Sequence, residues 1–247
     1  MPSNATMRPP TPDFTNRAQL TEMMDESCSR DDLRACLRDI SRLNRWFLAH
    51  SPLLQWLSSF APAQLPQPLR ILDVGCGYGD GLRRIERWAL ARNLAVGLTG
   101  LDIKPDTIAI ASQATPSASR IRWVAANIFA FTPQNPIHLL ISSQFTHHLS
   151  EPQIVRFLQW MERHAALGWF INDLSRAAVP YHFIRIFTRL ACLHPFVQHD
   201  APVSIARAFV PADWQTLCAA ANLTERDVSI QRFKPARLCV ARRKPQC

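Results

Sequence analysis

The chain has 247 residues, 47% of them hydrophobic, which suffices for one full α/β domain with an elaboration. Arginine supplies nearly all of the formal net charge of +9, and the basic residues form no run longer than residues 242–244, which disfavours a nucleic-acid partner. The seven cysteines contain no C-x-x-C pair, which argues against a disulfide framework and a zinc site, so we expect no bound metal.

The N-terminal region lacks the pattern of a signal peptide, and no apolar run approaches the 18 or so residues of a membrane-spanning helix. We therefore expect a cytoplasmic protein without stable membrane insertion, and the sequence leaves the oligomeric state open. Residues 1–12 hold four prolines and little apolar content, which predicts disorder.

Two helices are predicted before the first strand. Residues 31–50 carry apolar side chains at helical spacing, and a second apolar stretch, residues 53–60, ends at the proline-rich linker 62–68. Because both segments precede the sheet, we expect residues 1–66 to form a disordered N-terminus and a helical lid over a ligand cleft. Helices that only cover the sheet edge fit the same pattern.

The sequence is organised around a glycine-rich turn between a strand and a helix. Residues 70–74 form an apolar run too short for a helix, and residues 80–92 return to helical spacing. Between them, Gly75, Gly77 and Gly79 let the backbone take positive φ and approach a ligand without a Cβ in the way.

A second predicted strand, residues 96–101, ends in Asp102, which is placed to accept hydrogen bonds from two ribose hydroxyls. These features indicate a nucleotide-like cofactor at the carboxyl edge of a parallel sheet.

Two cofactor classes compete for this turn. The dinucleotide motif G-x-G-x-x-G requires a third glycine where Asp80 stands, so that match fails by one position. The chain instead has Asp73-x-Gly75-x-Gly77-x-Gly79, whose carboxylate suits a cationic cofactor end and would repel a pyrophosphate. This pattern resembles the first motif of the class I S-adenosylmethionine-dependent methyltransferases. A glycine turn in another α/β protein is the remaining alternative.

The resemblance extends to the adenine side of the expected site. A helix over residues 105–113 and a third strand over residues 121–126 lead to Asn127, where these methyltransferases commonly carry an acid that binds the adenine amino group. The Asn127 carbonyl can accept the same hydrogen bond. The resemblance also assigns Ile128, beside Asn127, and Ile103, beside Asp102, to the cofactor.

A fourth strand, residues 137–141, runs into the polar and aromatic segment 142–150, at the edge where such sheets bind ligands. A capping box at residues 150–153 begins the next helix, residues 151–164. Within the segment, the resemblance assigns Gln144 to the cofactor and Phe145 to the substrate.

After a fifth strand, residues 168–174, an insertion at about 176–210 is expected to cap the substrate site. It supplies the candidate substrate residues Tyr181, His182 and Arg207. A helix over 213–221 and antiparallel strands over 226–233 and 237–243 follow.

The resemblance therefore implies an α/β fold: a doubly wound, mostly parallel, seven-stranded Rossmann-like sheet in a methyltransferase domain spanning residues 67–247. The segments Asn44-Arg45-Trp46, Gln-Phe-Thr-His-His-Leu at 144–149 and Ser204-x-x-Arg207-Ala208-Phe209 resemble the quinone and polyketide branch of small-molecule methyltransferases.

The expected reaction is O-methylation of a small, apolar phenolic or polyketide-like metabolite in secondary metabolism, with S-adenosyl-L-methionine as cofactor. A histidine near the cofactor would serve as base. His148 ranks first by its place after the fourth strand, His199 second because Asp200 could orient its ring, and His147 third. Methylation of carbon or nitrogen, and a non-catalytic cofactor-binding partner, remain alternatives.

Overall fold

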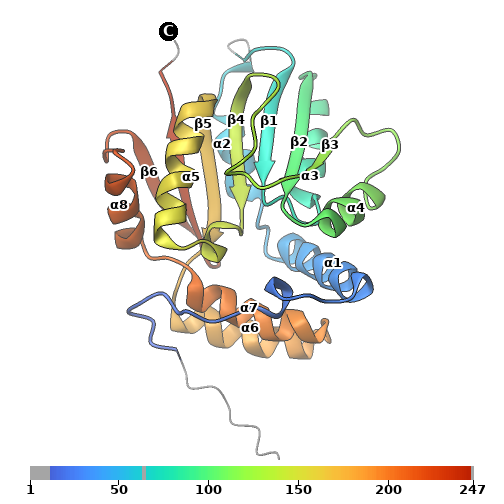
Figure 1. Ribbon diagram of the computed structural model, residues 1–247, viewed down its shortest axis with the longest axis vertical. Helices are drawn as coiled ribbons and strands as arrows, with labels where there is room; N and C mark the ends of the chain where they lie inside the picture. The colour runs from blue at the N-terminus through green and yellow to red at the C-terminus, as the bar shows by residue number, and fades with distance from the viewer. Residues whose placement is uncertain (1–11, 63–64, 246–247) are drawn as a thin grey trace, which may run out of the picture.

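The computed structural model describes residues 12–62 and 65–245, so the predicted disorder of residues 1–12 lies outside this part except at its last residue. One seven-stranded sheet forms the centre of the molecule, in the order β3-β2-β1-β4-β5-β7-β6 (Figure 1). Only β7 runs antiparallel to its neighbours, β5 and β6. The strands are β1 Leu69–Val74, β2 Val96–Asp102, β3 Arg122–Ala125, β4 Ile137–Ser143, β5 Ala165–Leu174, β6 Val228–Phe233 and β7 Arg237–Arg243. The predicted sheet is thus confirmed.

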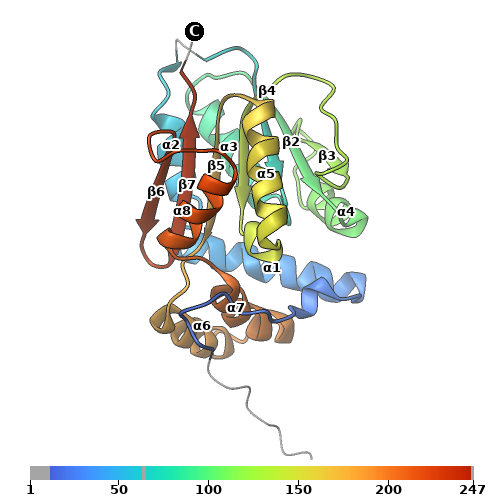
Figure 2. The same cartoon turned by 60° about the vertical axis from the view of Figure 1, so that its left-hand side comes forward.

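Helices cover both faces of the sheet, which makes three layers (Figures 1 and 2). α5 (Glu151–His164) and α8 (Pro211–Ala220) bury Phe157 and Trp214 on one face. α2 (Ser51–Ser58) and α3 (Asp80–Leu90) bury apolar side chains on the other. α4 (Pro105–Gln113) follows β2 and packs beside β3. The central parallel strands β1, β4 and β5 are buried on both faces, as their continuous apolar runs require, whereas the edge strand β3 is partly exposed.

The first long helix, α1 (Arg30–Trp46), is shorter than predicted. Ser29 caps its start by accepting a hydrogen bond from the Asp32 amide. The prediction of one helix to residue 50 is wrong, because Leu48 takes a left-handed φ of 50° and α2 starts separately at Ser51. At α5 the predicted capping box is confirmed, since the Gln153 side chain accepts from the Ser150 amide at 2.9 Å.

The insertion after β5 forms two helices, α6 (Ala178–Leu190) and α7 (Pro195–Arg207), which pack against each other at the carboxyl end of the strands. Residues 12–26, which we call the N-terminal strap, run beside them and include the short helix η1 (Met23–Asp25) (Figures 1 and 2). The Asp200 carboxylate accepts hydrogen bonds from the Met23 and Met24 amides and ties the strap to α7. The strap, α1, α6 and α7 thus lie over the edge where the sheet binds ligands.

None of the helices in the described part of the chain is long and apolar enough to cross a lipid bilayer.

Candidate active site

A cavity of about 700 Å³ lies at the carboxyl edge of the sheet. Its floor comes from the ends of β1, β2 and β4, and its walls come from α1, the strap, α6 and α7. This is the size range of small-molecule sites, and its place matches the general rule for open parallel sheets.

The three glycines after β1 serve different purposes. All have positive φ: 71° at Gly75, 50° at Gly77 and 75° at Gly79. A Cβ on Gly75 would lie 2.6 Å from the Phe145 ring, and one on Gly79 would lie 2.2 Å from the Trp123 ring. A Cβ on Gly77 would have no contact nearer than 3.9 Å. Gly77 therefore leaves open space toward the cavity, whereas Gly79 makes room for an aromatic ring and does not line the cavity.

Asp73, at the end of β1, presents a buried and incompletely bonded carboxylate. It is 4% exposed, lines the cavity, and has no hydrogen-bond partner at Oδ1. Burial raises the pKa of this carboxyl well above its usual range, and the nearby Asp80 and Asp102 carboxylates raise it further. A cationic group placed beside Asp73 would relieve both penalties.

Asp102, at the end of β2, is held by the backbone on both sides. Its Oδ2 accepts from the Gly77 amide at 3.3 Å and its Oδ1 accepts from the Lys104 amide at 3.0 Å. Burial raises the pKa of this carboxyl, while these amides oppose that effect. The glycine turn and the acidic residue of the next strand therefore form one rigid unit that faces the cavity.

The predicted adenine residues also line the cavity. Ile103 is 62% exposed, which leaves an apolar surface for a flat ring, and Ile128 is buried. Asn127 Oδ1 accepts from the Phe129 amide at 3.0 Å. An amide oxygen has a second lone pair, so this bond leaves Asn127 able to accept from an amino group.

Polar side chains from four elements meet beside Asp80, the first residue of α3. His50 Nε2 lies 2.8 Å from Asp80 Oδ2, and Asn44 Nδ2 donates to the same oxygen at 3.2 Å. Gln144 Nε2 and Arg237 Nη2 both donate to Asn44 Oδ1, at 2.7 and 3.3 Å. Although burial opposes ionisation, the bond to His50 holds the pKa of Asp80 below its usual value.

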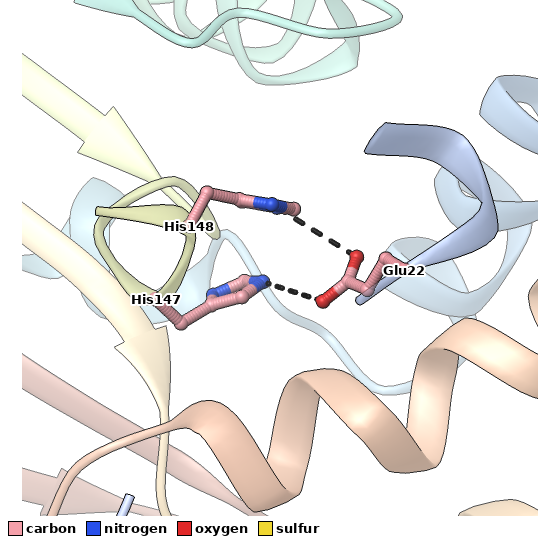
Figure 3. Close-up of side chains that lie close together, drawn as sticks. All are labelled: Glu22, His147 and His148. Carbon is pink, nitrogen blue, oxygen red and sulfur yellow. Dashed lines mark ion pairs between the residues drawn. The ribbon is translucent and has the colours of Figure 1, made fainter. Parts of the chain in front are cut away.

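At the other end of the cavity, His147 and His148 point toward the Glu22 carboxylate of the strap (Figure 3). His147 Nδ1 lies 2.7 Å from Asp173 Oδ1, and its Nε2 lies 3.6 Å from Glu22 Oε1. His148 Nε2 lies 3.8 Å from Glu22 Oε2, and its Nδ1 lies 3.1 Å from Asp25. Burial opposes ionisation of Asp173, but His147 holds the pKa of that carboxyl well below its usual range.

Glu22, His147 and His148 form the one group in the described part of the chain that could hold a metal ion, with ligand atoms within 4.8 Å of one another. Arg207 already provides a cation there: its Nη1 lies 3.5 Å from Glu22 Oε1 and 2.8 Å from Asp25 Oδ2. The guanidinium offsets the charge that a metal ion would neutralise, so we interpret the group as an ion-pair cluster.

Besides Gly79, four predicted site residues lie outside the cavity lining. Tyr181 is buried and packs edge-on against Phe14, and His182 is its neighbour on α6. His199 Nδ1 lies 2.7 Å from Asp200, but the two sit on α7 and the His199 side chain is 49% exposed. Arg207 lies behind Glu22. An α-helix distributes its side chains around its axis, so part of each helix of the insertion faces away from the cavity, and the sequence pattern alone did not resolve which residues these are.

Residues 71–168 match the protein family described as a methyltransferase domain. Over these residues the chain is similar to a methyltransferase domain. No curated protein matches the sequence.

Solved structures share the fold of this chain at low sequence identity. Human N-acetylserotonin methyltransferase, solved with S-adenosylmethionine, is 14% identical with a TM-score of 0.59, over 88% of this chain and 57% of its own. The plantazolicin methyltransferase BpumL, solved with S-adenosylhomocysteine, is 13% identical with a TM-score of 0.60, over 87% and 96%. Magnesium protoporphyrin IX methyltransferase of Synechocystis is 12% identical with a TM-score of 0.53, over 94% and 91%. The chain spans 48% to 60% of the length of the first four structures it matches.

The residues that line the cavity fit S-adenosyl-L-methionine, the cofactor that the sequence predicts. The unpartnered Asp73 Oδ1 suits the ammonium of its methionine part, and the bare backbone at Gly77 allows close approach. Asp102 suits the ribose hydroxyls, and Ile103, Asn127 and Ile128 suit the adenine.

Proposed function

We propose that the protein is an S-adenosylmethionine-dependent O-methyltransferase of a small, largely apolar phenolic or polyketide-like metabolite, working in cytoplasmic secondary metabolism. One observation carries the proposal: a single cavity joins the cofactor residues to the His147–Asp173 pair. Between these ends, the walls include Phe47, Val179 and Phe183, which suit an apolar acceptor.

His147 is the residue to which we assign the proton transfer. When bound, the cofactor supplies an electrophilic methyl group, and the acceptor oxygen must lose its proton to become an effective nucleophile. The contact of Nδ1 with Asp173 fixes the ring, and Nε2 points toward Glu22, which lines the same cavity. Nε2 can then take the hydroxyl proton, and the buried Asp173 carboxylate stabilises the imidazolium that forms.

His147 replaces His148 as the first choice, because the two imidazoles differ in their support. His147 is 3% exposed and contacts a fully buried carboxylate, whereas the His148 side chain is 30% exposed and contacts Asp25, which is itself partly exposed. A fixed ring places its proton-accepting nitrogen more consistently. His148 lies beside His147 with ring centroids 4.3 Å apart and completes the wall.

The methyltransferases with this fold do not point to one acceptor. Their names specify N-acetylserotonin, plantazolicin and magnesium protoporphyrin IX, which differ widely in size and in chemistry. The choice of acceptor for this chain therefore rests on the shape and lining of its own cavity.

The test is a transfer assay with S-adenosylmethionine carrying a labelled methyl group. The protein is incubated with alkylated phenols, pyrones and quinols, and each mixture is extracted with organic solvent. We expect label in the organic phase and, by mass spectrometry, a methyl ether. Label on carbon or nitrogen would replace O-methylation, and tight cofactor binding without any transfer would favour a non-catalytic partner. Label only in protein or RNA would contradict a small-molecule acceptor.

A further inference from the structure

Arg237, the first residue of β7, is a buried cation. It is 7% exposed and lines the cavity, yet Nη1 has no hydrogen-bond partner. Within residues 12–62 and 65–245, its guanidinium donates one hydrogen bond, from Nη2 to Asn44 Oδ1 at 3.3 Å, and forms no ion pair. Proteins rarely bury arginine unless its charge is paired.

The nearest carboxylates are already engaged by other groups. Asp173 and Asp80 both act electrostatically on Arg237. Asp173 lies against His147 and accepts from the Thr146 hydroxyl. Asp80 is bonded to His50 and Asn44. The Arg237 guanidinium therefore lies at the cavity wall, while the Asp173 and Asp80 carboxylates bond to other groups.

We propose that Arg237 binds a carboxylate of a ligand in this cavity. A guanidinium is planar and can donate two parallel hydrogen bonds to a carboxylate, and a buried site strengthens both. Asn44 and Gln144 line the same part of the cavity and hold Nη2 in place through the Asn44 oxygen. Nη1 remains as the donor for the ligand.

Two ligands of the proposed methyl-transfer reaction can supply this carboxylate, so the inference rests on that function. Asn44 connects Arg237 to Asp80 at the start of α3, beside the cofactor residues, which favours the amino-acid carboxylate of the cofactor. Arg237 also begins β7 next to the end of β5, where Asp173 and His147 lie, which is the acceptor side. An acidic group on the acceptor is the second source.

Calorimetric titrations distinguish the sources. S-adenosylhomocysteine carries the carboxylate, and 5′-methylthioadenosine lacks the whole amino-acid part. If the cofactor is the source, Arg237→Gln weakens binding of S-adenosylhomocysteine on the order of 10- to 100-fold and leaves methylthioadenosine unchanged. Arg237→Lys keeps the positive charge but lacks the paired donors of the guanidinium, so it recovers part of the lost affinity. The matched control is Arg232→Gln on the exposed side of the same hairpin, which changes neither ligand.

If the acceptor supplies the carboxylate, Arg237→Gln should change the binding of an acceptor analogue instead of S-adenosylhomocysteine. With saturating S-adenosylhomocysteine, hydroxybenzoate then binds to the wild-type protein more tightly than hydroxybenzamide, and Arg237→Gln abolishes that preference. Binding of S-adenosylhomocysteine itself stays unchanged. Either pattern supports a carboxylate site at Arg237.

Thermal unfolding without ligand separates a binding role from a structural one. Because Nη1 is unpartnered, we expect Arg237→Gln to unfold at the same or a higher temperature than the wild-type protein. A lower midpoint together with unchanged affinities in both titrations would overturn the proposal. If the wild-type protein bound no S-adenosylhomocysteine, the proposed function would fail, whereas normal binding unaffected by Arg237 in either titration would refute this inference alone.

Discussion

At the scale of single residues, Asp73 makes the cofactor affinity sensitive to pH. Burial raises the pKa of this carboxyl in the ligand-free protein, and an ammonium beside it would stabilise the charged form. Binding therefore releases a proton when the pH lies below that raised pKa. We expect the affinity for S-adenosylhomocysteine to fall as the pH falls through this range, by at most tenfold per pH unit.

Asp73→Asn should raise the stability of the ligand-free protein and lower its affinity for the cofactor. A raised pKa means that the ionised group costs stability as the pH rises through that pKa, so the ligand-free variant should have a higher unfolding midpoint at neutral pH. The variant should bind S-adenosylhomocysteine about 10- to 100-fold more weakly, without the pH dependence. Calorimetry and thermal unfolding measure both. A variant that is less stable and binds normally would show that the ammonium lies elsewhere.

His147→Gln should lower kcat by roughly 10²- to 10⁴-fold with little change in KM or in cofactor affinity, because it removes the base and leaves both binding surfaces in place. His164→Asn, which removes an imidazole from the far end of α5, is the control and should keep the wild-type rate. If His199→Asn lost the activity instead, the order predicted from the sequence would return, with His199 ahead of His147.

At the scale of elements, the Trp123 ring of β3 sets the need for glycine at two positions, one in the turn after β1 and one in β2. A Cβ on Gly79 would lie 2.2 Å from the Trp123 ring of β3, and a Cβ on Gly100 would lie 2.5 Å from the same ring. We expect Gly79→Ala and Gly100→Ala each to lower the free energy of unfolding by about 1–3 kcal/mol through overpacking, with an added penalty at Gly79 for its φ of 75°.

Urea unfolding of each single variant measures this loss. In the double variants with Trp123→Leu, the smaller side chain should recover part of the stability. Strictly additive effects of the two substitutions would show that the ring does not set the glycine requirement.

The elements were largely predictable because their signals are local. Each parallel strand is a short apolar run, the turn after β1 is marked by glycines, and the start of α5 is marked by Ser150 and Gln153. The end of α1 was missed because Leu48 takes a left-handed φ that favours glycine or asparagine, so its sequence gave no stop signal. The glycines mark the strand–turn–helix motif in the sequence, whereas no residue type marks the end of α1.

The site residues also differ in whether a local sequence pattern identifies them. Asp73, Gly77 and Asp102 belong to one motif and could be assigned from it. Glu22 and Arg237 have no local pattern: one lies in an irregular strap and the other begins a strand 215 positions later in the sequence. Only the folded chain brings both to the same cavity, so periodicity and spacing could not identify them.

At the scale of the whole molecule, the N-terminal strap closes one side of the cavity through polar contacts. Arg17 donates to carbonyl oxygens of His147, Leu149 and Arg207. Glu22 lines the cavity, and burial raises its pKa. Phe14, Ala18 and Met24 add apolar contacts with the neighbouring helices. Apart from η1, the strap has no regular backbone hydrogen bonding of its own, so it should open more readily than the sheet.

We expect hydrogen exchange of residues 17–26 to be faster than that of β1 in the ligand-free protein and to slow when S-adenosylhomocysteine and an acceptor are both bound. The peptides of β6, far from the cavity, provide the control. Equal protection of the strap with and without ligands would contradict its role as a mobile cover.

The central claim is that this cavity selects a sulfonium-type cofactor over a dinucleotide. Calorimetric titration of the purified protein with S-adenosylhomocysteine, with NAD as the comparison ligand, tests it most directly. The buried Asp73 carboxylate and the open backbone at Gly77 predict micromolar binding of S-adenosylhomocysteine and none of NAD. Binding of NAD alone would contradict the claim and would leave only Asp102 and the glycines with the roles assigned to them.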